Sequence, residues 1–365
     1  MHANSEQADG NSSLSISSGS GEYQVIIGAG LLDEVLAEST SVVIADQFFS
    51  ERLANFDPIL VAAYEEGKTL VEVERLATEL RSRGLTRGGS IIAVGGGIVQ
   101  DLATLVSSLY QRGVVWEYVP STLLAMADSC IGGKSSINAG DTKNLLGNIY
   151  PPRRVVIDPS LLTTLSDSEI SGGLCEAIKI SYCRGTNEFH HYLDIVDEFE
   201  SSDSKDNLKT YIRLLTCVLD YKRWFIEIDE FDRKERRQLN FGHTFGHALE
   251  VASRYEIQHG LAVGFGMLAA IHMVSEDREL SGVELELQEQ VCRLLQSLDL
   301  QFEIDWAYFE QAFESDKKHT NDHYALILPQ FGGGVEVNFL PRTEEVREKV
   351  RRATGFAMST DSQSQ

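Results

Sequence analysis

The sequence RRQLNFGHTFGHALE (residues 236–250) and, after a short spacer, YEIQHGLAVGFGM (255–267) form the stretch around which the chain is organised. His243 and His247 are four residues apart, so on a helix they share one face. His259 opens a second glycine-flanked turn. Neutral imidazole is a good zinc ligand, and a catalytic zinc site combines three protein ligands with one open position. An HxxxH pair on its own is more often an ordinary helix face, so the case for a metal depends on other residues.

Composition narrows the class of protein. The chain has 365 residues and a net charge of −23, with 42% hydrophobic residues, which is enough for two domains with a large core. The acidic balance argues against nucleic-acid binding, which needs a basic face, but allows an anionic small substrate. Five cysteines without CxxC spacing indicate reduced thiols and a cytoplasmic protein. No apolar run approaches the roughly 20 residues of a membrane span.

The order of apolar runs predicts two domains. The predicted strands are QVIIG (24–28), SVVIAD (41–46), ILVAAY (59–64), SIIAV (90–94), VVWEYVP (114–120) and RVVID (154–158), with helices over 68–83 and after 97. Such alternation is typical of a mostly parallel α/β sheet. Beyond about residue 165, helical stretches follow at 169–183, 208–226, 243–254, 261–275 and 283–298, with one hairpin from YALILP and VEVNFL. We expect an α/β nucleotide-binding domain over 21–165 and a helical metal- and substrate-binding domain over 166–355, with a disordered tail at 1–20 and a flexible tail at 356–365.

A glycine turn follows one predicted strand. Gly95, Gly96 and Gly97 connect the strand 90–94 to a helix, and Asp101 completes a GGGxxxD pattern. A backbone without Cβ atoms lets a pyrophosphate approach the helix N-terminus. The pattern is not GxGxxG, and a tight turn explains it about as well. Asp46 ends another strand, where it suits a ribose hydroxyl or, equally, a helix N-cap.

A lysine-rich segment follows at 119–153 and is predicted to be a long polar loop. It contains Asp128, Lys134, Asn138, Lys143 and Asn144. A lysine ammonium attracts phosphate as a point charge, and an asparagine amide hydrogen-bonds hydroxyl groups. The segment therefore favours a phosphorylated, hydroxylated substrate.

Further along, Glu176 and Lys179 are three residues apart and share one helix face. They form either a surface ion pair or part of a site, and Glu176 is the carboxylate that a two-histidine zinc site lacks. Lys222 taken alone is a solvated lysine. The triplet Asp316, Lys317 and Lys318 adds a basic spot near the end.

Together these motifs resemble the 3-dehydroquinate synthase family of sugar-phosphate cyclases over about residues 23–340. The motifs are GGGIVQD (95–101), Arg112-Gly113, VPSTLLAMADSCIGGK (119–134), TKNLLGNIYPP (142–152), GLCEAIK (173–179) and the two histidine segments. The sequence differs from the family pattern after GGK, where Ser135-Ser136 replaces threonine-glycine. The resemblance implies an α/β NAD-binding domain, a helical metal-binding domain, zinc or cobalt, and a homodimer.

The resemblance also implies roles for single residues. It assigns the metal to Glu176, His243 and His259, with His247 beside the metal without ligating it. It assigns NAD to Asp46, Glu65, Lys68, Gly95, Gly96, Gly97, Asp101, Ser121 and Thr122. It assigns phosphate to Lys134, Asn144, Asn240, Lys317 or Lys318, and Arg112 from the partner subunit, and it assigns the substrate carboxylate to Lys222 and Arg236. Asn138 and Lys143 complete the predicted substrate contacts, and Lys179, His247 and Asp128 are the expected hydroxyl contacts and proton relay.

Because both Lys222 and Arg236 are present, the resemblance favours a carboxylated substrate, 3-deoxy-D-arabino-heptulosonate 7-phosphate, converted to 3-dehydroquinate and phosphate. Alternatives are another cyclase, of the amino-dehydroquinate, 2-deoxy-scyllo-inosose or sedoheptulose 7-phosphate type, and a metal-dependent polyol dehydrogenase. A non-catalytic nucleotide-binding module is third. We expect no nucleic-acid or membrane partner.

Overall fold

The computed structural model describes residues 11–140, 142–201, 208–298 and 300–359. The chain divides into two compact units. The first unit comprises Met1–Leu165 and Glu198–Glu230, and the second comprises Ser166–Asp197 and Phe231–Gln365. The assignment of the whole of 166–355 to the helical domain is wrong, because the segment 198–230 belongs to the first unit.

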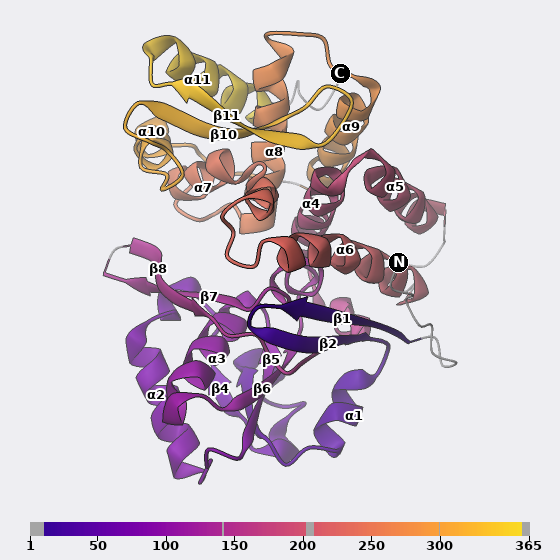
Figure 1. The fold of residues 1–365 in the computed structure, drawn as a ribbon, viewed down its shortest axis with the longest axis vertical. Coiled ribbons are helices and arrows are strands. Elements are labelled where there is room, and N and C mark those ends of the chain that lie inside the picture. The colour runs from indigo at the N-terminus through magenta and orange to yellow at the C-terminus, as the bar shows by residue number, and fades with distance from the viewer. Residues whose placement is uncertain (1–10, 141, 202–207, 299, 360–365) are drawn as a thin grey trace. The chain divides into compact units, whose positions relative to one another are not determined.

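The first unit is built on a seven-stranded sheet (Figure 1), in the order β1-β2-β9-β6-β5-β3-β4. The strands are β1 (Ser12–Ser18), β2 (Gly21–Ile27), β3 (Val42–Asp46), β4 (Ile59–Val61), β5 (Ser90–Gly95), β6 (Val115–Pro120) and β9 (Arg154–Ile157). All neighbours pair in parallel except β1 and β2. The central strand β5 is buried from Ile91 to Gly95, as expected for a parallel strand covered on both faces. The predicted α/β class is therefore confirmed.

The N-terminal tail prediction is wrong for the residues that the structure describes. Ser12–Ser18 forms β1, which pairs antiparallel with β2, placing Leu14 opposite Val25 and Ile16 opposite Tyr23. Leu14 and Ile16 are buried. The serine-rich composition masked a period of two, because small polar residues alternate with the two apolar ones that face the core. Residues 1–10 of the predicted tail lie outside the described ranges.

Helices α1 (Leu31–Ala37), α2 (Leu70–Ser82), α3 (Gly97–Leu109) and α6 (Leu208–Ile228) belong to the first unit. Helix α6 packs on β1, β2 and the short helices η5 (Ala125–Ser129) and η6 (Pro159–Thr164). Its apolar face, which includes Leu215, Leu219 and Phe225, explains why this helix joins the α/β unit although it lies far along the sequence.

The lysine-rich segment is not the predicted loop. Lys134–Ala139 forms β7 and Thr142–Ile149 forms β8, an antiparallel hairpin with an irregular register between Ile137 and Ala139. The glycine and asparagine content that suggested a loop reflects this irregular hairpin. Asn144 has a left-handed backbone, φ 52°, a conformation that asparagine tolerates better than most residues.

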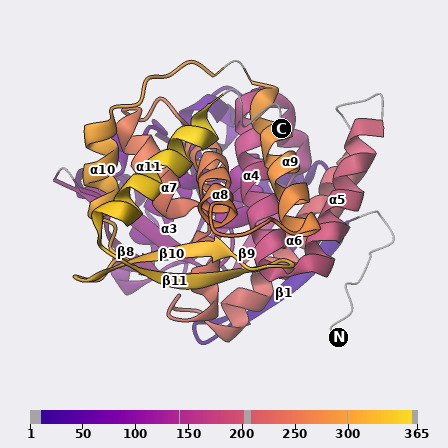
Figure 2. The same ribbon diagram turned by 90° about the horizontal axis from the view of Figure 1, so that it is seen from above.

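Helix α8 (His259–Ser275) is the centre of the second unit (Figure 2), packed against α4 (Asp167–Arg184), α7 (His243–Ala252), α9 (Gly282–Gln296) and α11 (Glu344–Met358). It is buried on nearly all sides, which matches its apolar sequence. Helices α5 (Thr186–Ser201) and α10 (Trp306–Glu314) and the predicted hairpin, β10 (His323–Pro329) with β11 (Val335–Pro341), complete the set of longer elements. The flexible C-terminal tail prediction is wrong from Phe356 to Met358, which continue α11; residues 360–365 lie outside the described ranges.

Two glycines let α8 approach its neighbours closely. A Cβ on Gly260 would lie 2.2 Å from the main-chain oxygen of Gly172 on α4, and one on Gly246 of α7 would lie 2.9 Å from that of Ala262. Any larger residue at either position would push the helices apart. These contacts bring the residues at the start of α8 to those on α4 and α7.

All five cysteines have free thiols and are buried, as the odd count predicted. Within the described ranges, no helix combines the length and the apolar character that a bilayer crossing requires.

Candidate functional site

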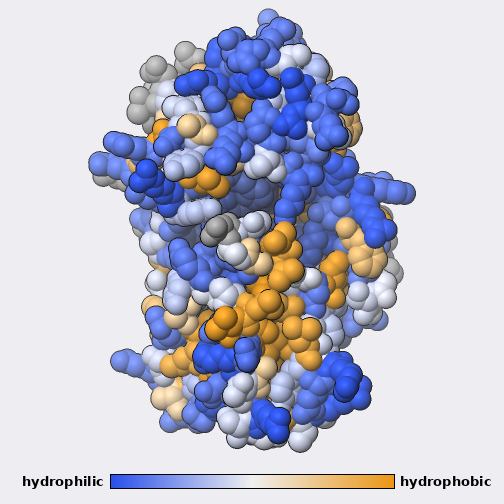
Figure 3. Space-filling model, turned by 90° about the vertical axis from the view of Figure 1, so that its left-hand side faces the viewer, coloured by the Kyte–Doolittle hydropathy of each residue, from blue (hydrophilic) through white to orange (hydrophobic). Residues whose placement is uncertain are grey.

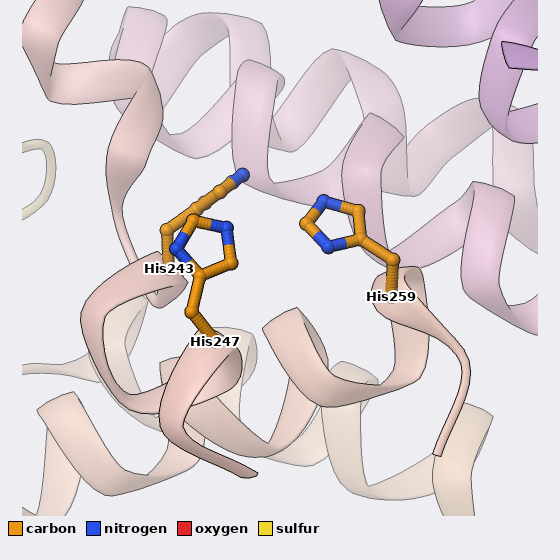
Figure 4. Close-up of side chains that lie close together, drawn as sticks. All are labelled: His243, His247 and His259. Carbon is orange, nitrogen blue, oxygen red and sulfur yellow. The ribbon is translucent and has the colours of Figure 1, made fainter. Parts of the chain in front are cut away.

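Three histidines of the second unit gather in one place (Figure 4). His243 and His247 come from α7 and His259 is the first residue of α8. Their candidate ligand nitrogens all lie within 4.8 Å of one another. Ring centroids are 5.3 Å apart for His243 with either partner and 5.6 Å for His247 with His259. The two histidines at HxxxH spacing on α7 therefore belong to one cluster, and the first residue of α8 supplies the third ring.

Glu176 of α4 completes this group. Its Oε1 lies 3.8 Å from Nε2 of His243 and 3.5 Å from Nε2 of His259. The side chain is fully buried, and Oε1 has no hydrogen-bond partner among the described residues. The other oxygen, Oε2, accepts a hydrogen bond from the buried ammonium of Lys179. We call Glu176, His243, His247 and His259 the histidine–glutamate cluster.

Two of the three imidazoles are oriented by acceptors at Nδ1. Nδ1 of His243 donates to the main-chain oxygen of Phe241 at 3.1 Å, and Nδ1 of His259 donates to Oε2 of Glu250 at 3.1 Å. A proton fixed on Nδ1 leaves Nε2 as the lone-pair nitrogen, the usual arrangement for metal-bound histidine. His247 makes no hydrogen bond within the described part of the chain and is exposed. This difference separates His243 and His259 from His247.

Electrostatics keep two of the rings neutral. Burial, the ammonium of Lys179 and the neighbouring imidazoles hold the pKa of His243 well below its ordinary value. Burial and the charge of His259 lower the pKa of His247 to about 4. Both rings are therefore unprotonated near neutral pH, the state in which imidazole binds metals.

Electrostatics favour the charged forms of both His259 and Glu176. Burial would lower the pKa of His259, but the carboxylates of Glu250 and Glu176 outweigh it and raise that pKa to about 10. Burial would raise the pKa of Glu176, but the ammonium of Lys179 and the ring of His259 lower it to about 2. A cation that binds here must displace the proton of His259, so its affinity falls with acidity.

The donor set fits a divalent metal. A carboxylate oxygen buried without a hydrogen-bond partner is costly, and Oε1 of Glu176 faces Nε2 of both His243 and His259. Nitrogen and carboxylate oxygen donors of this kind are those that zinc and related transition metals accept. Glu176, His243 and His259 could supply three ligand atoms, and the exposed His247 stands beside them.

The glycine turn of the first unit starts α3 without a side-chain cap. A Cβ on Gly96 would lie 3.1 Å from Cγ2 of Thr122, whereas one on Gly97 would meet only Oγ of Ser129 at 3.9 Å. The amides at this helix start are open to an anion. The main-chain N–H of Ser121 donates to the main-chain oxygen of Gly95 at 3.0 Å. The hydroxyl of Thr122 accepts the N–H of Ala125 at 3.2 Å. Both residues therefore stabilise the turn.

Asp46 serves as the N-cap of the short helix η1 (Gln47–Phe49) by accepting the N–H of Phe48 at 3.0 Å, which is one of the two roles left open by the sequence. It also lines a pocket of about 630 Å³ together with Phe48, Leu60 and Tyr64. The two aromatic side chains are exposed. A nucleotide at this end of the sheet would find an apolar surface beside a carboxylate.

Lys68 connects Asp101 of helix α3 to Asn144 of the β7–β8 hairpin. Its buried ammonium lies 2.8 Å from Asp101, 3.5 Å from Glu65 and 2.9 Å from Oδ1 of Asn144. Asn138 donates through Nδ2 to the main-chain oxygen of Glu65 at 2.9 Å and accepts the N–H of Asn144 at 3.0 Å. The side-chain amide of Asn138 is thus occupied by protein contacts.

Ser136 joins the same group. Its N–H donates to Asp101 at 3.1 Å and its hydroxyl donates to Oδ1 of Asn144 at 2.8 Å. We call Lys68, Asp101, Ser136, Asn138 and Asn144 the hairpin network. Ser136 was not among the residues predicted from the sequence. The signal that could have found it is that Ser135-Ser136 replaces the threonine-glycine of the family sequence.

Other predicted residues of the first unit are less closely grouped. Lys134 is exposed at the start of β7 and Lys143 is half-buried on β8. Arg112 is exposed with φ 69°. Lys222 of α6 is not solvated: its buried ammonium lies 2.7 Å from Oδ1 of Asp128 and contacts the main-chain oxygen of that residue.

In the second unit, Arg236 is buried and Asn240 ends the short helix η7 (Glu235–Asn240). The two neighbouring lysines differ. Lys317 is exposed, whereas Lys318 is partly buried and lies 2.8 Å from Asp316. The charges of Lys318 and Asp316 both act on the pKa of His247, which places Lys318 near the histidine–glutamate cluster.

Fold and site together define a class: an α/β unit with a glycine turn at a helix start, joined to a helical unit with a histidine–carboxylate cluster. The family models 3-dehydroquinate synthase N-terminal and C-terminal match residues 58–172 and 173–319. A 3-dehydroquinate synthase from Dictyoglomus turgidum is 33% identical over 342 residues, 90% of this chain and 93% of the relative. One from Enterococcus faecalis strain OG1RF is 36% identical over 302 residues, 82% of each chain. The chain belongs to the 3-dehydroquinate synthase family.

A solved structure supports the fold. The 2-epi-5-epi-valiolone synthase from Streptomyces hygroscopicus subsp. jinggangensis 5008, with NAD+ and Zn2+ bound, superposes with a TM-score of 0.77 at 23% identity, covering 92% of this chain and 96% of that one. At this identity the likeness concerns the fold alone. The resemblance to the family and the predicted dehydroquinate synthase-like fold are both confirmed.

Proposed function

We propose that this protein is a 3-dehydroquinate synthase, a carbon–oxygen lyase that converts 3-deoxy-D-arabino-heptulosonate 7-phosphate to 3-dehydroquinate and phosphate. The observation that carries the proposal is the buried carboxylate oxygen of Glu176, unsatisfied and directed at Nε2 of two histidines, in a chain whose relatives are 3-dehydroquinate synthases. Such an enzyme would act in the shikimate pathway.

Glu176, His243 and His259 would hold the metal, zinc or cobalt, and Glu250 would orient His259. When bound, the cation supplies Lewis acidity to a substrate hydroxyl. His247 would stand beside the metal without ligating it, as the family resemblance implies. It instead offers a neutral, exposed ring that can accept a proton from a substrate hydroxyl.

The nucleotide would lie on the first unit. Gly95, Gly96 and Gly97 would face the pyrophosphate, Asp46 a ribose, and Glu65, Lys68, Asp101, Ser121 and Thr122 the remainder. Held by these residues, NAD would supply reversible hydride acceptance, which leaves no net redox change. Lys68 would contribute a positive charge that Asp101 partly balances at 2.8 Å.

Substrate phosphate would meet Lys134, Asn144, Lys318 and Asn240, with Arg112 supplied by the partner subunit. Lys318 is preferred over Lys317 because its ammonium is partly buried beside Asp316. Lys143 stands on the same strand as Asn144 and adds charge to that face of the molecule. Asn138 is assigned to positioning, since its amide is used within the protein.

The substrate carboxylate would be held by Lys222 and Arg236, which neutral sugar phosphates do not need. Asp128 would hold the ammonium of Lys222 in place through their 2.7 Å contact and would also contact a substrate hydroxyl. Lys179, beside Glu176, completes the proton relay. This pair of cations favours the acidic substrate over the other cyclase substrates.

The assay is direct. Purified protein with NAD, zinc and the heptulosonate phosphate should release inorganic phosphate and form a product with the mass of 3-dehydroquinate. Sedoheptulose 7-phosphate and glucose 6-phosphate serve as controls and should release none. Absence of phosphate release from metal-loaded enzyme, or steady accumulation of NADH, would contradict the proposal; the second outcome would indicate a polyol dehydrogenase.

We also propose a homodimer. Figure 3 shows apolar side chains gathered on one face of the first unit. Large exposed apolar residues of this unit include Leu70 and Val71 at the start of α2 and Leu145 and Leu146 on β8. A contiguous exposed apolar face on a globular protein usually marks an interface. Light scattering after size exclusion should give twice the chain mass, and Val71→Lys should shift it toward monomer.

A further inference from the structure

We propose that Ser136 is a positioning residue which, together with Lys68, turns the side-chain amide of Asn144 so that its NH₂ group is presented to the substrate phosphate. The inference rests on the proposed function of Asn144 and adds to it a residue with no assigned role. It concerns the hairpin network of the first unit alone.

The orientation of the Asn144 amide follows from its neighbours. An ammonium can only donate hydrogen bonds, so the amide atom 2.9 Å from Nζ of Lys68 must be the oxygen. The hydroxyl of Ser136 donates to that same oxygen at 2.8 Å. Both lone pairs of Oδ1 are then used, and Nδ2 donates no hydrogen bond within the described residues. The amide can offer a ligand only its two N–H groups.

The backbone beneath this amide is also fixed. The N–H of Asn144 donates to Oδ1 of Asn138 at 3.0 Å, which stabilises the left-handed conformation at φ 52°. Ser136 is itself held, because its N–H donates to Asp101 at 3.1 Å independently of its side chain. The hydroxyl also lies 3.5 Å from Oδ2 of Asp101, a longer contact than the 2.8 Å bond to Asn144. Because the N–H still holds Oδ1 of Asp101, removing the hydroxyl should loosen the Asn144 amide and leave the Asp101 carboxylate in place.

The presented group suits a phosphate. Lys134 and Ser136 are two residues apart on β7, so both side chains lie on one face of the strand, and the Asn144 amide bonds to Ser136 on that face. An ammonium and an amide N–H group on the same face of the hairpin are donors that suit the acceptor oxygens of a phosphate. Ser136 stands where the family sequence has glycine, at the second position after GGK, and glycine has no hydroxyl to make this contact.

Four variants test this inference by two measurements. The first is the dissociation constant of inorganic phosphate from NAD-loaded protein, by calorimetry. The second is KM for the heptulosonate phosphate. Losing one neutral hydrogen bond should weaken phosphate binding by Ser136→Ala roughly threefold to tenfold and raise KM alike, with kcat and the affinity for NAD nearly unchanged. Ser136→Thr, which retains the hydroxyl, should restore wild-type values.

Two further variants bracket the effect. Asn144→Asp keeps an acceptor for Lys68 and Ser136 but removes both N–H donors and adds negative charge, so phosphate affinity should fall by at least about 30-fold. Ser135→Ala is the matched control: Ser135 lies on the opposite face of β7 and donates to Asn148 at 2.7 Å. It should leave phosphate affinity unchanged.

The results separate this inference from the proposed activity. If the wild type releases no phosphate from the sugar acid, yet phosphate affinity follows the predicted variant order, the activity is wrong and the positioning role stands. If the wild type is active but Ser136→Ala binds phosphate as tightly as wild type, or Ser136→Thr fails to restore it, the positioning role is overturned. A wild type that binds no phosphate at all also overturns it.

Discussion

The histidine–glutamate cluster of the second unit and the hairpin network of the first unit both concentrate charged and polar groups, but they differ in how completely those groups are satisfied. In the hairpin network, Lys68 pairs with Asp101 and Oδ1 of Asn144 accepts two hydrogen bonds. In the cluster, one oxygen of Glu176 is buried with no partner in the described chain.

This difference indicates what each region can do. A network whose buried groups satisfy one another holds side chains in place, and it presents to a ligand only the donors left over. A buried acceptor with no donor is costly, and it is tolerated where a cation completes it. The cluster should therefore depend on metal for stability, and the hairpin network should not.

Glu284 is a reference for the same contrast within the second unit. Like Glu176 it is fully buried beside a cation, Arg278. Unlike Glu176, it has both oxygens bonded: Oε2 accepts from Nη1 of Arg278 at 3.0 Å and from Ser281 N and Oγ at 2.7 and 2.8 Å, and Oε1 accepts from Nη2. It needs no metal.

The largest expected effect is that of Glu176→Gln. It removes the anionic ligand and takes a carboxylate away from the buried ammonium of Lys179; breaking a buried pair of this kind costs about 3–5 kcal/mol. We expect phosphate release to fall to background and bound zinc, measured by mass spectrometry, to be lost. Urea unfolding gives the stability. Glu289→Gln, on an exposed pair of α9, is the control; a Glu176→Gln protein that retains zinc would contradict the assigned ligand set.

Metal removal should come next in size. Zinc at a thousand times its dissociation constant stabilises the folded state by about 4 kcal/mol, so chelation should lower the melting temperature and zinc should restore it. Hydrogen exchange should quicken in α4, α7 and α8 while β7 and β8 stay protected as before. Equal loss of protection in both units would remove the distinction drawn between the two regions.

Glu250→Gln should have a smaller effect. Loss of the carboxylate that holds Nδ1 of His259 should weaken zinc binding about 10- to 100-fold, measured by competition with a chromogenic chelator. With zinc saturating, kcat should stay within a few-fold of wild type. Glu256→Gln, at an exposed position between α7 and α8, controls for charge. Zinc affinity within twofold of wild type would show that Glu250 does not position the ring.

Glu284→Gln should have the smallest effect, and one that depends on pH rather than metal. Burial opposes ionisation of Glu284, but Arg278 and Ser281 outweigh it and lower its pKa. A depressed carboxyl pKa stabilises the fold above the unfolded value of about 4.3 and loses that contribution as pH falls through the folded value. We expect wild type to exceed the variant by about 2 kcal/mol at pH 7 in urea unfolding, and the gap to close on acidification.

Chelation should leave that gap unchanged. If the gap widens as the pH falls, or disappears with the metal, the carboxylate of Glu284 is not the internally satisfied group described above.

The periodicity of apolar residues predicted much of the fold, but it failed where a polar composition hid a strand. The strands from β2 to β6, the glycine turn and the long helices follow from apolar periodicity, and the hairpin of β10 and β11 was predicted from its paired apolar runs. The serine-rich strand β1 and the hairpin of β7 and β8 were taken for irregular chain, because small and polar residues hid their pairing. Helix α6 was given to the wrong unit, since a helical pattern does not say which surface its apolar face will meet.

For the site, sequence alone supplied the candidate ligands Glu176, His243 and His259, through their residue types and motifs. Sequence did not predict Glu250 behind His259, the choice of Lys318 over Lys317, or the bridge from Ser136 and Lys68 to Asn144. These depend on distances between side chains that belong to different elements, and no spacing along the chain encodes them.

By itself, then, the sequence determined the kinds of element and the chemistry available, because periodicity and residue type act over a few neighbouring positions. Tertiary structure alone decided which groups meet and which are left unsatisfied. Close helix contacts at Gly246 and Gly260 bring α4, α7 and α8 together, and only that packing buries Glu176 with one oxygen unpaired against two imidazoles.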